Sequence, residues 1–402
     1  MSITPEQMEI LPGAAEGSMV INMGPQHPST HGVLRLVVEL DGETIVDVVP
    51  HIGYLHTGIE KTCEYEQYQK CIPLVERMDY LSAMNNSLAF VLSVEKLLDI
   101  EVPPRGVWMR MIFSELQRIA SHLVWLGTHA LDIGAMTPFF YCFRERERIL
   151  DMFEQLSGVR MFPSWIQVGG WRADMPEGLL EKIAKFVEEF PAKVDDYEGL
   201  LTENPIWVER TRNIGIITAD ECIALGINGP ILRGSGYAFD LRKANPYLYY
   251  DQVEFDIPTG TVGDVYDRFL VRVEEMRQAA RIIKQCIERI PEGPVSSDDR
   301  KVVPPPREEL DNSMESLIHH FKLWTEGFRP PEGEAYVPIE GPKGEIGYYV
   351  VSDGGNRPWR VKTRPPCFMN LQALPLMSRG HMVADIVAII GSIDIVLGEI
   401  DR

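Results

Sequence analysis

Cysteine pairs are missing from this sequence of 402 residues, although six cysteines are present. No two of them stand in a C-x-x-C arrangement, and none forms a tight cluster with histidine. Zinc and iron–sulfur centres held by thiolates need such spacings. We therefore expect no metal site, and cysteines that are small buried side chains in a reducing compartment. They are Cys63, Cys71, Cys142, Cys222, Cys286 and Cys367.

Positive charge is scarce as well. The 39 lysines and arginines are outnumbered by 59 acidic residues, which gives a formal net charge of -20. This balance argues against nucleic acid as a partner and against adsorption to an anionic membrane through a basic patch. Acidic residues, proline or glycine interrupt every long apolar run, and the N-terminus lacks the features of a signal peptide. We expect a cytoplasmic protein that reaches a membrane only through another subunit.

Three successive segments make up the expected fold, which is of the α+β class. Residues 1–56 form a β-rich part with strands over 18–23 and 33–49, the second stretch folding back at Asp41-Gly42. Residues 57–292 form a bundle of long helices. Residues 293–402 form a linker, a hairpin around "EGPKGE" and an apolar C-terminal helix that packs on the bundle.

Capping signals predict where the helices begin. Thr57 with Glu60 predicts a helix that runs toward Cys71, and Asp79 predicts the start of the next, with Tyr80 in its first turn. Pro104 suits the first position of a long helix.

The same signals apply further along the chain. One helix is expected to stop at Gly158, and Asp174 with Glu177 predicts a helix that Pro191 interrupts. Another long helix is expected over residues 265–290.

Two histidines stand four residues apart in "GPQHPSTHG", which spans residues 24–32. His27 precedes Pro28, which favours an extended backbone and breaks the helical register that a metal-binding pair would share. The sequence thus argues against a helical metal pair here and places His31 on a loop that enters a sheet.

Several polar residues lie among apolar neighbours. Asp132 stands near a helix end in "HALDIGAM", where a carboxylate needs a partner or stays neutral at some cost, so a functional and a structural role are equally open. His122, His129 and the pair His319-His320 are more often hydrogen-bonded core histidines than ligands. None of these residues decides a function alone.

Taken together, the motifs resemble the D-subunit family of respiratory complex I, NADH:quinone oxidoreductase. In that complex the D subunit is the large, hydrogenase-like subunit. They run in order along nearly the whole chain and include "GPQHPSTHG", "ERMDYLSAMNN", "SELQRIASHLVWLG", "DIGAMTPFF", "GPILRGSG", "IHHFK", "PKGEIGYYVVSDG" and "GSIDIVLGEIDR". The resemblance implies the fold of the nickel–iron hydrogenase large subunit without its metal site. It also implies a subunit beside the quinone pocket that is not active alone.

The resemblance assigns roles to residues. The second histidine of the loop, His31, and the tyrosine of "RMDY", Tyr80, are implied to approach the quinone headgroup. Asp132 is implied to be the acidic partner of His31 and to favour its protonated form. Further residues are implied to support the quinone site, and these are His27, Thr30, Asp394 and Val396.

The resemblance also bears on the electron donor. Electrons are implied to arrive from a [4Fe-4S] cluster of a neighbouring subunit, near which Arg77 lies. Thr57 and Phe162 stand where many members of the family have an arginine and a histidine. Because positive charge stabilises a reduced cluster, these departures predict a lower cluster potential with a weaker pH dependence, and menaquinone rather than ubiquinone as the acceptor.

Quinone chemistry matches these residue types, because adding two electrons and two protons requires groups that release protons and hold negative charge. The expected partners are the terminal-cluster subunit, other peripheral-arm subunits and a quinone-channel membrane subunit, at the cytoplasmic face of the membrane.

Three alternatives stay open. A true nickel–iron hydrogenase subunit would need two C-x-x-C pairs, and "ERMDYLSAMNN" and "GEIDR" stand in their places. A scaffold subunit of the peripheral arm would not touch quinone. A related ferredoxin-dependent membrane complex would differ in a module that this chain does not contain.

Overall fold

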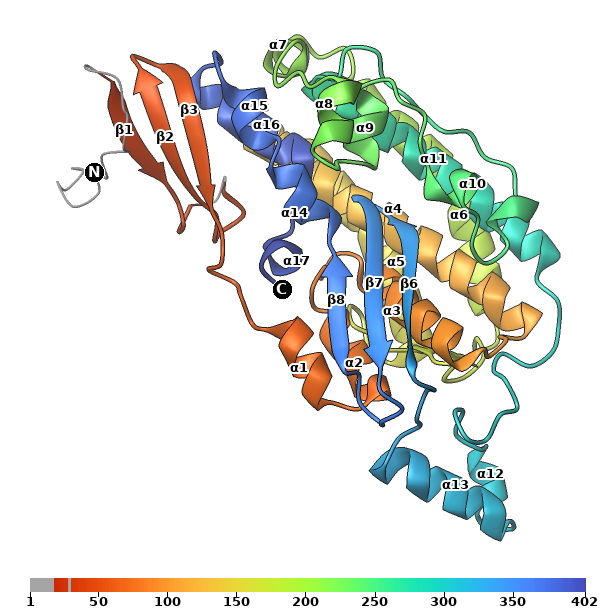
Figure 1. Cartoon of the computed structure of the whole chain (residues 1–402). Coiled ribbons are helices and arrows are strands. Elements are labelled where there is room, and N and C mark those ends of the chain that lie inside the picture. The colour runs from red at the N-terminus through yellow and green to blue at the C-terminus, as the bar shows by residue number, and fades with distance from the viewer. Residues whose placement is uncertain (1–17, 28–29) are drawn as a thin grey trace.

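The structure is a computed structural model that describes residues 18–27 and 30–402. Long helices form its centre, and two three-stranded sheets lie around them (Figure 1). The first sheet has the order β1-β2-β3, with antiparallel pairs throughout. Its strands are β1 (Met19–Met23), β2 (Arg35–Asp41) and β3 (Thr44–His51).

The hairpin between β2 and β3 confirms the turn predicted at Asp41-Gly42. Asp41 pairs with Thr44, so two residues make the connection, and Gly42 has a φ of 62°, which glycine adopts without strain. Most of β2 is buried, whereas β1 is partly exposed.

Four long helices form the bundle: α4 (Pro104–Asp132), α5 (Met136–Ser157), α6 (Leu179–Leu201) and α11 (Val265–Arg289). α4 packs against α5 and α11, and α11 also packs against α6. The predicted starts and stops at Pro104 and Gly158 are confirmed, because Pro104 is the first residue of α4 and Gly158 ends α5 with a φ of 78°.

Three predictions about helix caps are wrong. α1 (Ile59–Tyr65) follows Gly58 without a side-chain cap, and the chain breaks before α2 (Tyr68–Val75), so no single helix runs to Cys71. The carboxylate of Glu60 instead accepts a hydrogen bond from the backbone of Thr363, 2.9 Å away. That tertiary contact replaces the local capping box.

Asp79 does not cap α3 (Ala83–Leu98), because the helix begins after Ser82 and Tyr80 lies before it. Similarly, α6 follows Gly178 and continues through Pro191. A proline in a long helix with a strongly apolar face is tolerated when packing outweighs the lost hydrogen bond.

The second sheet has the order β6-β7-β8 and packs on α3. Its strands are β6 (Gly333–Gly341), β7 (Gly344–Ser352) and β8 (Arg360–Arg364). The predicted hairpin is confirmed, and β8 adds a third strand in a proline- and arginine-rich span.

The C-terminal helix is broken. α16 (Val383–Ile393) stops at Asp394, which has a φ of 58°, and α17 (Leu397–Asp401) follows. The remaining elements are β4 (Ile166–Gln167), β5 (Gly170–Trp171), α7 (Pro205–Thr211), α8 (Ala219–Ala224), α9 (Pro230–Gly234), α10 (Leu241–Ala244), η3 (Tyr250–Gln252), α12 (Arg307–Leu310), α13 (Met314–Thr325), α14 (Pro366–Leu371) and α15 (Leu374–Ser378).

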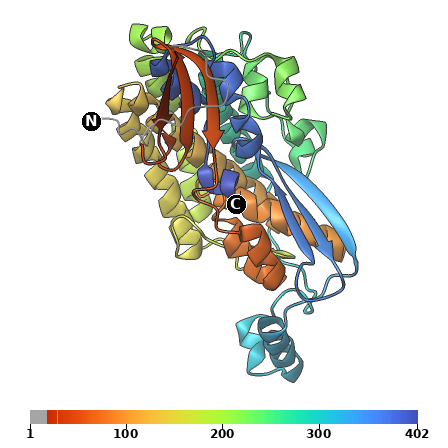
Figure 2. The same ribbon diagram turned by 60° about the vertical axis from the view of Figure 1, so that its left-hand side comes forward.

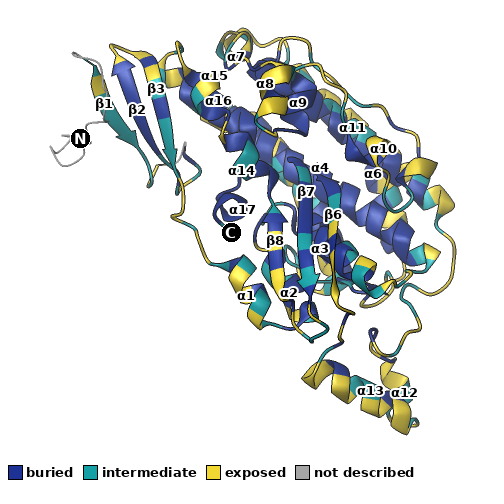
Figure 3. Cartoon of the chain, viewed as in Figure 1, coloured by how far each residue is buried: buried dark blue, intermediate teal, exposed yellow. Residues whose placement is uncertain are grey.

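Two hydrophobic cores hold these elements together. The larger core lies within the bundle and under the β6-β7-β8 sheet. The smaller core joins the N-terminal sheet to α9 and to the C-terminal helices, and thus takes residues from all three segments expected from the sequence. Figure 3 shows the buried residues concentrated along the central helices.

A network of buried charges crosses the bundle. Arg118 binds Glu115 at 3.0 Å, and Arg233 binds both Glu275 and Glu340. All of these side chains are at most 1% exposed. Breaking such a pair leaves a charge uncompensated, so the network fixes the helices in one arrangement rather than adding much net stability.

Candidate functional site

Lys343 lies at the centre of a second cluster of buried polar side chains, apart from the contacts of that network. It stands in the two-residue turn between β6 and β7, and its side chain is 1% exposed. Its Nζ lies 3.1 Å from Asp79 Oδ2, donates to Ser121 Oγ at 2.9 Å, and lies 3.9 Å from Asp394 Oδ2. Burial opposes the charge, but the carboxylates of Asp394 and Asp79 outweigh it and raise the pKa of Lys343.

The hairpin tip is held from two sides. Arg118 Nη1 donates to the carbonyl oxygen of Gly341 at 2.9 Å, and Asn370 Nδ2 donates to that of Lys343 at 3.1 Å. A Cβ at Gly229 would lie 2.4 Å from the Cα of Gly344, and a Cβ at Gly344 would lie 2.5 Å from Oδ1 of Asn228, so the loop before α9 and the hairpin approach this closely because both positions are glycine. The ammonium is therefore fixed in position by its backbone.

Two carboxyl groups come to Lys343 from opposite parts of the chain. Asp79 accepts a hydrogen bond from the backbone of Leu81 at 3.1 Å, in the segment before α3. Asp394 occupies the break between α16 and α17, and its Oδ2 has no hydrogen bond to any residue that the structure describes. Burial raises the pKa of Asp394 to about 6, against the opposing charges of Lys343 and Arg272.

Glu399 adds a further carboxyl group from α17, at 1% exposure. It accepts a hydrogen bond from the backbone of Cys367 at 3.2 Å. Burial and the neighbouring Asp79 raise the pKa of Glu399 to about 8. The cluster thus holds one ammonium and carboxyl groups that titrate near neutral pH.

Tyr80 borders this cluster. Its ring is half-buried in the smaller core, 3.5 Å from where a Cβ on Gly398 would lie. Burial and then the carboxylate of Asp79 raise the pKa of Tyr80, and Lys343 opposes them.

His31 approaches the same lysine from the N-terminal loop. The pKa of His31 is lowered to about 4, mainly by burial; a hydrogen bond to the backbone of Ile395 opposes this shift, and the charge of Lys343 makes a smaller contribution in the same direction as burial. The Nε2 atom is buried without a hydrogen-bond partner in the described part of the chain. We therefore assign a neutral ring with its proton on Nδ1, which leaves the lone pair of Nε2 free to accept.

The loop that carries His31 is held by its own backbone. The carbonyl oxygen of His27 accepts from the backbone of Thr30 and Gly32 and from Thr30 Oγ1 at 3.0 Å. Thr30 is fully buried, and a Cβ at Gly24 would lie 2.1 Å from the carbonyl oxygen of Leu34. His31 itself has a φ of 52°, an uncommon conformation for a non-glycine residue. Residues 28 and 29 of the predicted loop lie outside the described residues.

Asp132 does not join His31 in this structure. It is the exposed last residue of α4, and within the described residues it makes no hydrogen bond or ion pair. Partial loss of hydration is the cause of its raised pKa. The charge that acts on His31 comes from Lys343, and a cation disfavours the protonated imidazole that pairing with Asp132 would favour.

Val396 and two histidines of the bundle, His122 and His129, are buried. Val396 is 2% exposed, and its carbonyl oxygen accepts from Glu399 and Ile400 at the start of α17. His122 is a hydrogen-bonded core residue as expected, with Nε2 2.9 Å from Glu275. His129 is buried between the rings of two tryptophans, but neither ring nitrogen has a hydrogen-bond partner among the described residues, so the expected hydrogen bond is absent. His319 and His320, also expected in the core, lie outside it on α13.

Two of the three residues expected around an electron-donating cluster lie together. The guanidinium of exposed Arg77 lies over the ring of Phe162, 5.0 Å from its centroid, and also bonds the carbonyl oxygen of Pro73. The two side chains form a cation–π contact on the surface of the chain. Thr57, the third residue, is exposed and stands one residue before Gly58.

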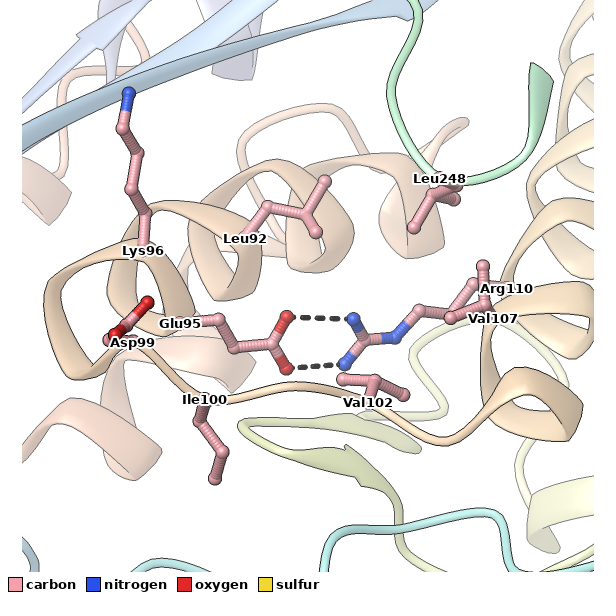
Figure 4. Close-up of a pocket in the computed structure, with 9 residues that line it drawn as sticks. All are labelled: Leu92, Glu95, Lys96, Asp99, Ile100, Val102, Val107, Arg110 and Leu248. Atoms are coloured by element: carbon pink, nitrogen blue, oxygen red, sulfur yellow. Dashed lines mark hydrogen bonds and ion pairs between the residues drawn. The ribbon is translucent and has the colours of Figure 1, made fainter. Parts of the chain in front are cut away.

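An open cavity of about 310 Å³ lies elsewhere, between α3 and the start of α4 (Figure 4). Its polar floor is the ion pair of Glu95 and Arg110, whose two hydrogen bonds measure 2.7 and 2.8 Å. The carboxylate also accepts from the backbone of Gly169. Because Glu95 and Arg110 pair with each other, Lys96 and Asp99 are the other charged residues of a lining that is otherwise apolar.

Sequence reasoning misses Lys343 and Glu399. The segment "GPKGE" predicts a turn, and lysine in a turn is normally solvated. Only the long-range packing of the hairpin tip buries it. The signal present in the sequence is the pair of glycines around the lysine, which allows close approach of another backbone.

The sequence matches known proteins along nearly its whole length. Residues 132–402 match the family described as respiratory-chain NADH dehydrogenase, 49 Kd subunit. The chain belongs to this family. It is 56% identical to the second NADH-quinone oxidoreductase D subunit of Chloroflexus aurantiacus, over 99% of this chain and 98% of the relative. It is 58% identical to the second D subunit of a Roseiflexus species, over 96% and 93%, and 56% identical to the D subunit of a Wolbachia, over 96% and 99%.

The family predicted from the sequence motifs is thus confirmed, and with it membership of an oxidoreductase complex. The mixed α and β architecture is confirmed as well. Within residues 18–27 and 30–402, no helix has the length and apolar character needed to cross a bilayer.

Proposed function

We propose that this chain forms the quinone-binding and quinone-reduction site of an NADH:quinone oxidoreductase, complex I. One observation carries the proposal: the buried Nε2 of His31 has no hydrogen-bond partner among the described residues, and His31 and the half-buried Tyr80 both lie in the field of one buried ammonium, Lys343. Buried polar atoms normally have partners, so unused ones beside a charge support a polar ligand.

The residue types suit the reaction. Quinone takes up two electrons and two protons, and negative charge develops on its oxygens. Tyr80 donates a hydrogen bond to one oxygen, and the positive charge of Lys343 stabilises that oxygen as electrons arrive. Neutral His31 accepts the hydrogen bond of the quinol hydroxyl through Nε2. In the free site, His31 is thus an acceptor rather than the proton donor expected from a pairing with Asp132.

Protons can be held close by. Asp394 and Glu399, with pKa values raised to about 6 and about 8, are carboxyl groups that exchange protons near neutral pH. Delivery of a proton would leave one more negative charge beside Lys343. We propose that this change of buried charge is the signal that the site transmits to the rest of the complex. His27, Thr30 and Val396 keep the supporting roles that the family resemblance implies. Asp132, implied as the acidic partner of His31, lies at the end of α4 apart from the Lys343 cluster.

The electron donor is proposed to be a [4Fe-4S] cluster of a neighbouring subunit, on the side of Arg77. The aromatic Phe162 beneath the guanidinium and the neutral Thr57 support a low cluster potential and therefore menaquinone as the acceptor. The proposed partners are the terminal-cluster subunit, other peripheral-arm subunits and a quinone-channel membrane subunit, with the chain at the cytoplasmic face of the membrane. The proposed fold relationship is to the nickel–iron hydrogenase large subunit.

The test compares two activities in membranes that carry Tyr80→Phe. Reduction of quinone by NADH should fall at least tenfold, because the hydroxyl that donates to quinone is lost. Reduction of an artificial acceptor that takes electrons upstream should keep its rate. Tyr65→Phe, on a side chain that is 63% exposed, is the matched control and should change neither activity.

His31→Gln tests the second side of the site and should also lower quinone reduction selectively. If both variants reduce quinone at the normal rate in an assembled complex, the chain is a scaffold and the proposal fails. If both activities vanish together, Lys343→Arg, which keeps the charge but moves it, separates a site defect from an assembly defect.

A further inference from the structure

α13 presents an apolar face to solvent. Its side chains at positions 314, 317, 318, 321 and 324 follow the i, i+3, i+4, i+7 spacing of one helical face. They are Met314, Leu317, Ile318, Phe321 and Trp324, exposed by 73%, 47%, 49%, 65% and 57%. We call these five residues the α13 face. Figure 3 shows α12 and α13 as a largely exposed unit at one end of the molecule.

Hydrogen bonds from other parts of the chain hold the C-terminal end of α13 in place. Gln67 Nε2 donates to the carbonyl oxygen of Thr325 at 2.9 Å, and Gln69 Nε2 donates to that of Leu323 at 2.8 Å. Asn356 Nδ2 donates to the carbonyl oxygen of Glu326. Leu323 is 6% exposed and belongs to the larger core.

The N-terminal end of α13 is held as well. Ser313 caps the helix, and Ser316 Oγ donates to Glu309 Oε2 at 2.9 Å, which ties α13 to α12. Both ends are thus secured, and the views in Figures 1 and 2 agree that the unit stands away from the bundle. A helix held in this way cannot turn its apolar face inward without losing these bonds.

Contiguous apolar surface of this kind marks an interaction site on a soluble protein. The charge of the residues around the α13 face indicates which kind of partner can bind to it. Between Arg307 and Glu334, seven acidic residues stand against three basic ones, a formal net charge of -4. A second copy would bring the same negative charge, and an anionic membrane would be repelled.

We infer that the α13 face binds an apolar groove with a basic rim on another subunit of the same complex. The binding mode is that of an amphipathic helix laid in a groove, with Phe321 and Trp324 as its central anchors. The inference depends on membership of a complex and is independent of the quinone role, because α13 contributes no residue to the Lys343 cluster.

Photo-crosslinking in the assembled complex gives the first test. Benzoylphenylalanine in place of Phe321 should form a crosslink to one other subunit, within an apolar segment flanked by lysine or arginine. The same residue in place of Lys322, on the polar side of the helix, should give a crosslink at least fivefold weaker. Crosslinks only to lipid, only to a second copy or to no protein would overturn the inference.

A charge-matched set of variants gives the second test. Phe321→Glu with Trp324→Glu changes the net charge by the same amount as Lys322→Glu, but only the first removes apolar anchors. The double variant should keep the melting temperature of the isolated full chain and lower its incorporation into the complex at least tenfold. Lys322→Glu should lower incorporation less than twofold.

Equal loss in both variants, or no loss in either, contradicts an apolar docking face. If the double variant melts at a lower temperature, the crosslink from position 321 decides, because that substitution keeps an aromatic side chain.

Discussion

The ammonium of Lys343 lies 3.1 Å from the carboxylate of Asp79, although 264 positions separate the two residues in the chain. A hairpin tip and the segment before α3 meet at this contact, inside the molecule. Buried opposite charges depend on each other, since each offsets the cost of removing the other from water. The contact therefore ties the stability of the fold to the charge state of the proposed site.

Lys343→Met should destabilise the chain by about 3–5 kcal/mol, because the substitution leaves the carboxylates of Asp79 and Asp394 buried without a cation. Urea unfolding of the full chain at pH 8 measures this free energy. Lys362→Met, which breaks an ion pair with Glu60 on a lysine that is 47% exposed, should cost only about 0–1 kcal/mol. Equal effects of the two substitutions would show that the buried lysine is not paired as described.

Glu399→Gln should change how stability varies with pH. Burial and Asp79 raise the pKa of Glu399 from its ordinary value of 4.5 to about 8, so the folded state holds a proton that the unfolded state has released. Stability from this proton is fully present below pH 4.5 and is lost as the pH rises toward 8. Each pKa unit between the two states corresponds to about 1.4 kcal/mol.

The glutamine variant lacks this titration, so its unfolding free energy should fall less between pH 5 and pH 8 than that of the original chain. Urea titrations at pH 5, 6, 7 and 8 measure both slopes. Glu315→Gln, on a side chain that is 86% exposed, should leave the slope unchanged. Parallel slopes for Glu399→Gln and the original chain would contradict the raised pKa.

Local patterns are sufficient for most of the fold. The β2-β3 turn, α4 from Pro104, the end of α5 at Gly158 and the β6-β7 hairpin follow from signals within a few residues. The predictions that fail concern residues whose partners lie far away in the chain. Glu60 has the spacing of a cap but binds Thr363.

The candidate site also contains residues that the sequence predicts and residues that only long-range packing brings together. Family motifs point to His31, Tyr80 and Asp394, and the structure gathers these three around Lys343. Lys343 itself could not be predicted, because a lysine in a glycine-rich turn is buried only when the whole hairpin docks. The expected pairing of His31 with Asp132 also depends on tertiary structure, and in this structure Asp132 remains exposed.

Gly391→Ala tests the packing of α16 on the bundle. A Cβ at this position would lie 2.1 Å from Nδ1 of His129, whose ring is held against Trp125 and Trp207. We expect a loss of about 1–3 kcal/mol from overpacking. Adding His129→Ala should recover part of that loss, so a double-mutant cycle should give a coupling energy above about 0.5 kcal/mol.

Gly199→Ala is the control for helix propensity, because it lies within α6 with no atom near its Cβ position. It should stabilise the chain by about 0.4–1 kcal/mol. If Gly391→Ala behaves in the same way, the close approach of His129 to α16 is wrong.

Phe162→His tests the proposed surroundings of the electron donor. The imidazole would stand beneath the guanidinium of Arg77, where the phenyl ring now lies. When protonated, it adds positive charge that stabilises a reduced cluster, so the midpoint potential of the neighbouring subunit's cluster should rise and become pH-dependent. Phe162→Tyr changes the ring without adding a group that titrates near neutral pH and should leave the potential nearly constant. A redox titration of the purified complex from pH 6 to pH 8 measures both variants. If the histidine variant shows the same pH-independent potential as the original chain, Phe162 does not border the cluster, and the argument for menaquinone loses its support.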